Sequence, residues 1–345
     1  MPIFLLHIKG FSMQAILTNP QAPAINDPAA LAATTLSDPV PGEHDLLVEV
    51  KAISVNPVDT KVRASAKEAR VLGWDVSGVV RAVGASVRLF APGDEVFYAG
   101  DITRPGANSS LHVVDERIVG RKPASLGHAD AAAIPLTAIT AWELLFDRVG
   151  VAEGQGQGRR LLIIGAAGGV GSMLTQLASK LTRLTVIGTA SRQETAQWVS
   201  ALGAHHVIDH RQPFKPQLEQ LGLPEVDIVI SLTHTDSHYA QIIEVLAPQG
   251  QLALIDDPAS LDAVPLKRKS ISLHWEMMFT RSMFQTADMI QQHELLQRVA
   301  QLLDDGVLRT TTGEHYGRIS AENLRRAHAL LESGKAKGKI VLEGF

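Results

Sequence analysis

Hydrophobic and polar positions alternate along the middle of the chain in blocks that predict strands and helices in turn. The four aliphatic residues 161–164 are typical of a buried strand. Small residues follow over 165–172, and 173–181 has apolar residues at helical spacing. Later blocks predict strands over 184–189, 206–208, 227–231, 251–255 and 271–275, and helices over 194–202, 214–221 and 238–246. This alternation predicts an α/β fold with a Rossmann doubly wound parallel sheet, covered by helices on both faces.

The turn between the first of these strands and its helix has the composition of a phosphate-binding site. Free backbone N–H groups and the helix dipole both face an anion at a helix N-terminus. Glycine also lets the backbone approach a pyrophosphate closely. An ordinary βα turn is the alternative, and Ala166 breaks the strict G-x-G-x-x-G pattern, but the alternation that follows favours a dinucleotide. The predicted cofactor contacts here are Gly165, Ala166, Gly168, Gly169, Val170 and Gly171.

The end of the second strand of this sheet indicates which dinucleotide binds. An NAD site has an acidic residue there, which accepts hydrogen bonds from the ribose hydroxyls. The strand over 184–189 is followed by Ala190, Ser191 and Arg192, with no acid. Ser191 can donate to a 2′-phosphate and Arg192 can pair with it as a charged fork. We therefore expect NADP(H), although Ser191 as a helix cap beside a solvated Arg192 is the alternative.

The two ends of the chain have a different pattern, rich in short strands that glycine and proline separate. Strands are predicted over 45–54, 75–83, 94–98 and 338–342, and helices over 295–303 and 321–331. The tail is expected to fold back onto the first domain and leave the cofactor domain inserted between them. The expected parts are an N-terminal extension (1–12), a catalytic domain (13–138), a Rossmann NADP-binding domain (139–285) and a C-terminal segment that completes the catalytic domain (286–345).

Composition narrows the function classes. The 345 residues carry a formal net charge of −4, so nothing favours nucleic acid or an anionic membrane as a partner. The absence of cysteine excludes disulfides, cysteine-ligated zinc and thiol catalysis. No apolar stretch is expected to reach transmembrane length, and residues 1–12 lack the basic start and cleavage site of a signal peptide. We expect a cytoplasmic protein.

Several motifs in order resemble the medium-chain dehydrogenase/reductase superfamily, over essentially the whole chain from Met13. Within it the chain is similar to the quinone oxidoreductase branch, and most similar to the zinc-type alcohol dehydrogenase-like proteins. The resemblance implies a GroES-like β-rich catalytic domain, a Rossmann domain, a cleft between them and a homodimer. The motifs are SVNPVDTK (54–61), VLGWDVSGVV (71–80), FAPGDEV (90–96), AAGGVG (166–171) and AKGKIVL (336–342).

The same resemblance brings zinc into question. Zinc alcohol dehydrogenases hold the metal through a cysteine and the histidine of a Gly-His-Glu motif, and this sequence has Asn56 and Trp74 in those places. The indole of Trp74 only donates, so it cannot ligate zinc. His234, Asp236 and His238 form an alternative cluster whose competing interpretation is a polar helix cap. We expect no metal.

Chemistry without zinc favours a quinone or an α,β-unsaturated carbonyl compound, because hydride adds in conjugation and hydrogen-bond donors suffice for the oxyanion. Asn56 is the leading catalytic candidate, because its amide can donate to substrate oxygen or position the nicotinamide ribose; the alternative is that Asn-Pro starts a turn. Asp59 is expected to orient neighbouring groups or act as an acid. Trp74 is interpreted equally well as an aromatic wall or as a core residue. Thr137 is expected beside the nicotinamide by resemblance. Lys335 and Lys339 are expected to be solvated, with contact to a phosphate as the alternative.

These expectations define a zinc-independent, NADPH-dependent reductase of quinones or activated alkenes, with solvent supplying the proton. The expected partner is a small-molecule substrate, and the expected assembly is a homodimer. Two alternatives stay open: a zinc-type alcohol or aldehyde dehydrogenase, and a protein that binds NADPH without catalysis.

Overall fold

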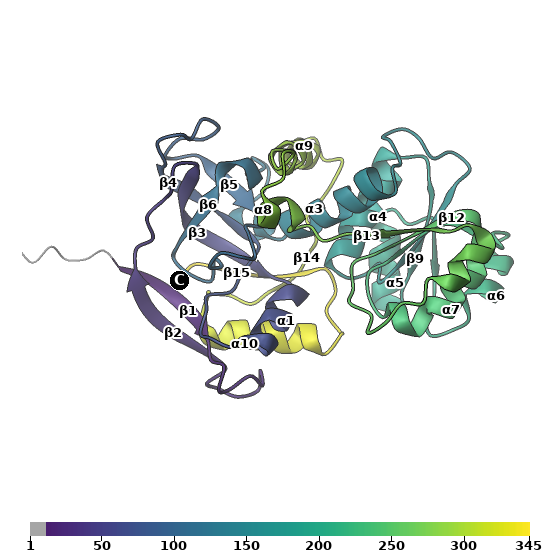
Figure 1. The fold of residues 1–345 in the computed structure, drawn as a ribbon, viewed down its shortest axis with the longest axis horizontal. Coiled ribbons are helices and arrows are strands. Elements are labelled where there is room, and N and C mark those ends of the chain that lie inside the picture. The colour runs from purple at the N-terminus through teal and green to yellow at the C-terminus, as the bar shows by residue number, and fades with distance from the viewer. Residues whose placement is uncertain (1–11) are drawn as a thin grey trace, which may run out of the picture.

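The computed structural model describes residues 12–345, which form two lobes (Figure 1). The expected extension over 1–12 lies outside the described residues except for Ser12, which already belongs to the first strand. The first lobe has a seven-stranded sheet of order β14-β15-β3-β4-β5-β7, with β6 on β3, and a separate β1-β2 ribbon. Its strands are β1 (Ser12–Thr18), β2 (Leu31–Ser37), β3 (Asp45–Val55), β4 (Val76–Val83), β5 (Glu95–Tyr98), β6 (Leu111–Asp115), β7 (Val119–Arg121), β14 (Thr312–His315) and β15 (Lys339–Glu343).

The second lobe is a six-stranded sheet of order β10-β9-β8-β11-β12-β13 in which every pair is parallel. The predicted doubly wound sheet in a β-rich GroES-like protein is therefore confirmed. Its strands are β8 (Arg160–Ile164), β9 (Thr185–Thr189), β10 (His206–Ile208), β11 (Val226–Ser231), β12 (Leu246–Leu254) and β13 (Ser272–Trp275). The helices between them are α4 (Gly169–Leu181), α5 (Gln193–Ala201), α6 (Phe214–Gln220), α7 (Thr235–Val245) and the 3₁₀ turn η3 (Val264–Lys269).

The aliphatic run of β8 shows why this sheet is buried on both sides. Successive side chains of a strand point to opposite faces. Leu161 and Ile163 join a core that also contains α4, while Leu162 and Ile164 join a second core under α6 and α7. An uninterrupted apolar strand therefore has a partner for every side chain.

A helical segment connects the lobes. It comprises α2 (His128–Ala132), α3 (Pro135–Trp142) and the π-helical turn η2 (Glu143–Arg148). By length and composition the run His128–Arg148 is the one helix among the described residues that could cross a membrane, so the expectation that no stretch reaches that length is wrong. Of its most apolar window, 78% is buried inside the protein, which is typical of a core helix.

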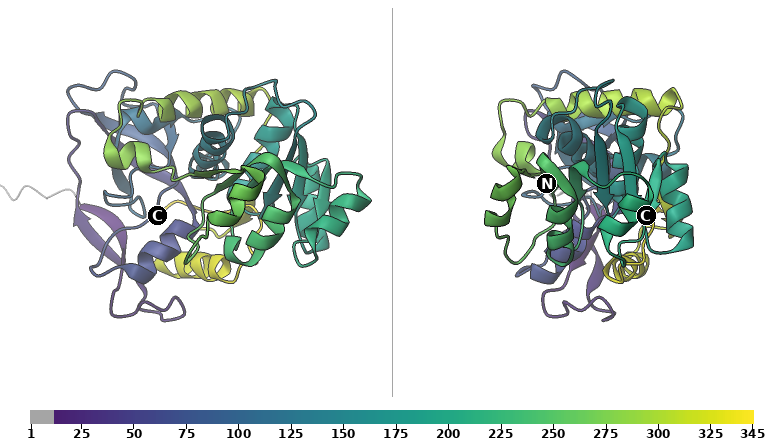
Figure 2. Two further views of the ribbon diagram at one scale, coloured as in Figure 1. Left: turned by 45° about the vertical axis from the view of Figure 1, so that its right-hand side comes forward. Right: turned by 90° about the vertical axis from the view of Figure 1, so that its right-hand side faces the viewer.

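The tail returns to the first lobe. Strand β15 pairs antiparallel with β3, and the helix α10 (Ala321–Glu332) packs against β2 and the helix α1 (Pro57–Ser65). The helix α9 (Gln291–Asp304) packs against β7 and α3, and its long side is seen at the top of both views in Figure 2. The remaining short elements are η1 (Glu116–Ile118) and α8 (Thr280–Phe284).

Helix α1 has no counterpart in the predictions. Asn56 is its N-cap, Pro57 its first residue, and the Asp59 side chain accepts a hydrogen bond from the Asn56 backbone N–H. An N-cap Asn, a Pro at N1 and an acid at N3 are a helix-start signal. The Asn-Pro pair therefore begins a helix and not an isolated turn.

Candidate functional site

A cavity of about 460 Å³ lies where the lobes meet, at the carboxyl ends of the parallel strands. Its volume is that of a small-molecule site, and this edge of a doubly wound sheet is where ligands bind. The first lobe contributes residues 55–58 and Lys61, and α3 contributes Leu136, Thr137 and Thr140. The rest of the wall comes from the glycine turn, from the segments after β11, β12 and β13, and from the tail.

The glycine turn forms one side of this cavity. Gly165 has a φ of +83°, which favours glycine, and Gly165, Gly169, Val170 and Gly171 all line the cavity. The last three are the first residues of α4, whose N–H groups have no partner within the helix. Gly168 is the N-cap, with its own N–H donating to the Gly165 carbonyl.

The turn is held closely from both sides. A Cβ on Gly171 would lie 2.3 Å from the Gly165 carbonyl oxygen and 2.6 Å from Cα of Ala166, which is fully buried. On the other side, the N–H of Gly338 donates to the Ala167 carbonyl at 2.9 Å, so the tail is bonded to the turn. This cradle of close backbone and free N–H groups fits the pyrophosphate of a dinucleotide.

Ser191 and Arg192 follow β9 at the same edge of the sheet. They do not line the cavity, but the N–H of Gly165 donates to Thr189 at the end of β9, which ties the two segments together. Ser191 is half-buried, and the exposed Arg192 guanidinium donates to the Lys335 carbonyl at 2.9 Å. An exposed guanidinium held by a single carbonyl is free to turn toward an anion.

Lys339 lies at the base of the cavity and is only 3% exposed, so the prediction that it is solvated is wrong. Its ammonium donates to the Val55 carbonyl at 3.0 Å and to Oδ1 of Asn56, and lies 2.9 Å from Oδ2 of Asp75. All three N–H groups thus have acceptors. Burial raises the pKa of Asp75, and the charge of Lys339 opposes that rise.

Asn56 lines the cavity as expected, but its amide is already engaged. Nδ2 donates to Oδ2 of Asp75 at 3.0 Å and approaches the Trp74 carbonyl at 3.5 Å, while Oδ1 accepts from Lys339. The amide is therefore not free to donate to a substrate oxygen as the sequence suggested. It fixes the position of the buried Lys339–Asp75 pair instead.

Asp59 is 1% exposed and does not line the cavity. Its carboxylate accepts from the Asn56 N–H at 2.7 Å and from the Gly73 N–H at 3.0 Å, so it orients backbone groups around the site. Burial raises the pKa of Asp59 to about 7, against the opposing effect of those two hydrogen bonds and of Lys339.

The raised pKa of Asp59 predicts a pH-dependent part of stability. A carboxyl group with a folded pKa above its unfolded value stabilises the fold below about pH 4, and this contribution is lost as pH rises through about 7. Between about pH 4 and pH 7 we expect the unfolding free energy of the wild type to fall relative to that of Asp59→Asn, by up to about 4 kcal/mol. Urea unfolding at a series of pH values measures it. Parallel curves for the two proteins would contradict the assignment.

Comparisons with known proteins agree on one family. Residues 42–132 match the alcohol dehydrogenase GroES-like domain and residues 202–342 match the zinc-binding dehydrogenase domain. A zinc-type alcohol dehydrogenase-like protein of Staphylococcus aureus is 42% identical over 311 residues, covering 88% of this chain and 92% of its own. The chain belongs to the medium-chain dehydrogenase/reductase superfamily. The family resemblance seen in the sequence is confirmed.

Other members of the superfamily extend the comparison. The crystal structure of a Rhizobium etli protein described as a zinc-dependent alcohol dehydrogenase has 54% sequence identity and a TM-score of 0.93. The match covers 97% of this chain and 99% of its own. A quinone oxidoreductase of Lama guanicoe is 27% identical, over 88% of this chain and 90% of its own. The structure of a mycobacterial protein complexed with NADPH has 26% sequence identity and a TM-score of 0.82, and the match covers 96% of this chain and 99% of its own.

The donors described here do not fit the zinc site that the superfamily's names imply. Asn56 and Asp75 are committed to Lys339, a cation that a metal ion would repel. Within residues 12–345 no group of three or more His, Cys, Asp or Glu side chains is placed to hold a metal. His234 bonds to the neighbouring Thr233 at 2.7 Å, and His238 stacks near Phe214, so the alternative cluster forms no ligand set.

Trp74 is a core residue of this superfamily member and not an aromatic wall of the cavity. It is fully buried and its indole N–H donates to the Asp101 carbonyl at 3.2 Å. Its ring meets Phe279 edge-on, with centroids 6.3 Å apart, and Phe279 lines the cavity. Trp74 therefore supports the aromatic residue that faces the ligand space.

Thr137 lines the cavity through its methyl group, since Oγ1 donates back to the Ile134 carbonyl at 3.0 Å. Most of the neighbouring wall is apolar. Its apolar side chains are Val58, Leu136, Val170, Leu232, Ile255, Met277, Met278, Phe279 and Leu331. Such a surface suits a flat apolar ligand.

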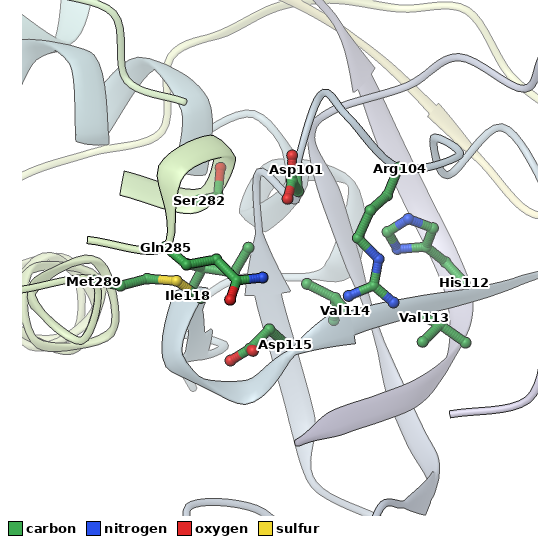
Figure 3. Close-up of a pocket in the computed structure, with 10 residues that line it drawn as sticks. All are labelled: Asp101, Arg104, His112, Val113, Val114, Asp115, Ile118, Ser282, Gln285 and Met289. Atoms are coloured by element: carbon green, nitrogen blue, oxygen red, sulfur yellow. The ribbon is translucent and has the colours of Figure 1, made fainter. Parts of the chain in front are cut away.

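A second cavity, of about 40 Å³, lies between strands of the first lobe and the segment that joins α8 to α9 (Figure 3). Arg104 points into it and bonds Asp45 with both nitrogens, at 2.8 and 3.0 Å. His112 bonds the Pro105 carbonyl and Tyr98, and burial lowers the pKa of His112 to about 4. The space holds no more than a few water molecules, so the larger cavity is the candidate active site.

Proposed function

We propose that this protein is a zinc-independent reductase that uses NADPH to reduce quinones or α,β-unsaturated carbonyl compounds. One observation carries the proposal: the glycine turn, the buried Lys339 and a largely apolar wall share a single cavity. The NADPH-bound and quinone oxidoreductase relatives support it. We further propose a cytoplasmic protein with the domain limits stated above.

Cofactor binding follows from the chain's own groups. The first N–H groups of α4 hold the pyrophosphate, and Ser191 with Arg192 holds the 2′-phosphate once Arg192 leaves the Lys335 carbonyl. When bound, the reduced nicotinamide supplies a hydride. The apolar residues around Thr137 exclude water and stack on flat rings.

The substrate's developing negative charge is stabilised by the base of the cavity. Lys339 is a buried ammonium held in place by Asn56 and Asp75, so its position needs no rearrangement during reaction. Asp75 offsets part of that charge. The resulting field is weaker than that of a metal ion, which restricts the enzyme to substrates whose charge spreads by conjugation.

Purified protein tested with NADPH on a panel of quinones, enones, aldehydes and alcohols decides between the candidate functions. Turnover of quinones or enones without stoichiometric zinc is the expected result. Metal-dependent turnover of alcohols or aldehydes would establish the zinc-type dehydrogenase instead. Tight NADPH binding with no turnover across the panel would establish a non-catalytic binding protein.

Arg192→Ala is expected to lower the NADPH-to-NADH preference in kcat/KM by about 10- to 100-fold, because it removes a charged contact worth roughly 1.5–3 kcal/mol. Steady-state kinetics with both cofactors measure this. Arg183→Ala is the matched control, since Arg183 is also exposed but precedes β9 at the opposite end of that strand. An unchanged preference in Arg192→Ala would remove Arg192 from the phosphate site.

A homodimer is also proposed, on the exposed apolar residues beside the edge strand β13. Trp275 is 50% exposed, and Met277, Met283 and Phe284 are exposed nearby. An uncovered strand edge with apolar side chains is a pairing surface. Sedimentation equilibrium showing a monomer mass would refute it.

A further inference from the structure

A buried carboxyl group in the wall of the active-site cavity has a second buried carboxyl group behind it. Glu276 follows β13 and lines the cavity, and its side chain has no exposed surface. Its Oε2 accepts from Nε of Arg148 at 2.7 Å. Its Oε1 is buried and has no hydrogen-bond partner among residues 12–345. A buried polar atom without a partner is costly, so a missing donor is implied.

Glu143 is the group that can supply the missing donor to Oε1 of Glu276. It is 1% exposed, lies on the π-helical turn η2, and accepts from Arg281 at 2.6 Å. Burial, together with the charge of Glu276 and a hydrogen bond to it, raises the pKa of Glu143 to about 9, against the opposing effect of Arg281. Two carboxyl groups can bond to each other only when one keeps a proton. A proton held between Glu143 and Glu276 gives Oε1 its partner.

A series of ion pairs connects Glu143 to the solvent-exposed surface. Arg281 contacts Glu143, Asp147 at 3.1 Å and Asp288 at 3.0 Å. The exposed fraction of these side chains rises from 1% at Glu143 to 11% at Arg281, 33% at Asp147 and 55% at Asp288. The pair thus has the cavity on one side and a polar path to water on the other.

We propose that Glu276, with Glu143 behind it, is the acid that protonates the substrate anion after hydride transfer. This inference rests on the reductase function proposed above. The O–H bond of the Glu276 carboxyl group breaks and a C–H or O–H bond forms on the enolate or hydroquinone anion. Arg148 and Arg281 stabilise the two carboxylates left behind, and Glu143 then takes a proton from solvent, which the pair shares again. The active site then needs no direct access of water to the reacting carbon, unlike the sequence-based expectation.

Infrared spectroscopy of the cofactor-free wild-type protein tests for the held proton. Asp59 contributes a C=O stretch of a protonated carboxylic acid that disappears as pH rises through about 7, and the pair should add a second C=O stretch that disappears only as pH rises through about 9. This second band should be lost or shifted in Glu143→Gln and in Glu276→Gln. This readout needs no substrate and no cofactor.

Kinetics test delivery of the proton. Glu276→Gln is expected to lower kcat by about 100-fold or more, the scale of general acid catalysis, while NADPH affinity measured by fluorescence titration stays unchanged. In Glu143→Gln the loss of a neighbouring negative charge should move the alkaline limb of the kcat profile to lower pH. Glu153→Gln is the control, because Glu153 pairs with Arg298 on the surface and should leave both readouts unchanged.

Each outcome decides. The second band together with the kcat loss supports the proposal. Absence of the second band in the wild type overturns it, even where a variant fails to fold. The second band combined with a full rate in Glu276→Gln overturns proton delivery. Inactivity of the wild type on the whole panel overturns the reductase function and delivery with it, whereas the second band still shows whether the pair holds a proton.

Discussion

Lys339→Met is expected to destabilise the protein by about 3–5 kcal/mol, the cost of leaving one charge of a buried pair without its partner. Methionine keeps the length of the side chain but removes the ammonium. Asp75, which is fully buried, would then keep only the Asn56 amide on Oδ2 and the Leu136 N–H on Oδ1. Activity should be lost as well, because the cavity loses its fixed buried cation.

The double variant Lys339→Met with Asp75→Asn tests that explanation. The asparagine introduced by the second substitution is neutral and retains an acceptor for the Leu136 N–H. The double variant therefore has no uncompensated buried charge, and it should recover at least half of the stability that Lys339→Met loses. Activity should not return. Urea unfolding and steady-state kinetics measure the two effects separately.

Lys335→Met is the matched control, since the Lys335 side chain is exposed in the same basic tail. A substitution of that kind changes stability by no more than about 0.5 kcal/mol. If Lys339→Met behaved in the same way, or if the double variant were as unstable as the single one, the buried ion pair would not be what holds the base of the cavity.

Periodicity along the sequence was sufficient to predict the parallel sheet and its glycine turn. The run 161–164 and the apolar blocks after it have one stable arrangement, because a strand that is apolar on both faces needs helices on both. The helix after the turn was predicted from Met173, and it begins four residues earlier, at Gly169. Four of the six turn residues predicted to contact the cofactor do line the cavity.

Long-range pairing is what the sequence could not show. Lys339 alternates with Lys335 and Lys337 in a basic stretch, and nothing local distinguishes it from them. It is buried because β15 pairs antiparallel with β3, with Ile340 opposite Val55, which brings its ammonium to Asn56. Glu143 and Glu276 likewise meet only because η2 and the segment after β13 come together in the fold.

For Trp74 and Asp59, which lie close to the cavity, the sequence could not show whether the side chain faces the cavity or lies behind its wall. The motif that contains Trp74 was recognised, but residue type does not reveal on which side of a wall a ring lies. Only its contact with Phe279 places Trp74 behind the lining. For Asp59 the spacing to Asn56 was itself informative, because an Asn three residues before an Asp, with Pro57 between, signals a helix start.

Gly171→Ala is expected to lower NADPH affinity by more than about 100-fold and to destabilise the protein by roughly 1–3 kcal/mol, the usual cost of overpacking. The added Cβ would lie 2.3 Å from the Gly165 carbonyl oxygen and 2.7 Å from the Ala166 carbonyl carbon. These are backbone atoms of the turn itself. The turn must therefore move, and the N–H groups at the start of α4 no longer point toward the pyrophosphate.

Gly168→Ala provides the control within the same turn. Its Cβ would meet only the Gly165 carbonyl oxygen at 3.5 Å, an ordinary contact, and its φ of −73° suits any residue. It should bind NADPH within about threefold of wild type, a change of well under 1 kcal/mol. Fluorescence titration of both variants measures the contrast. Equal affinities would mean that the close approach of α4 to Gly165 and Ala166 does not shape the phosphate site.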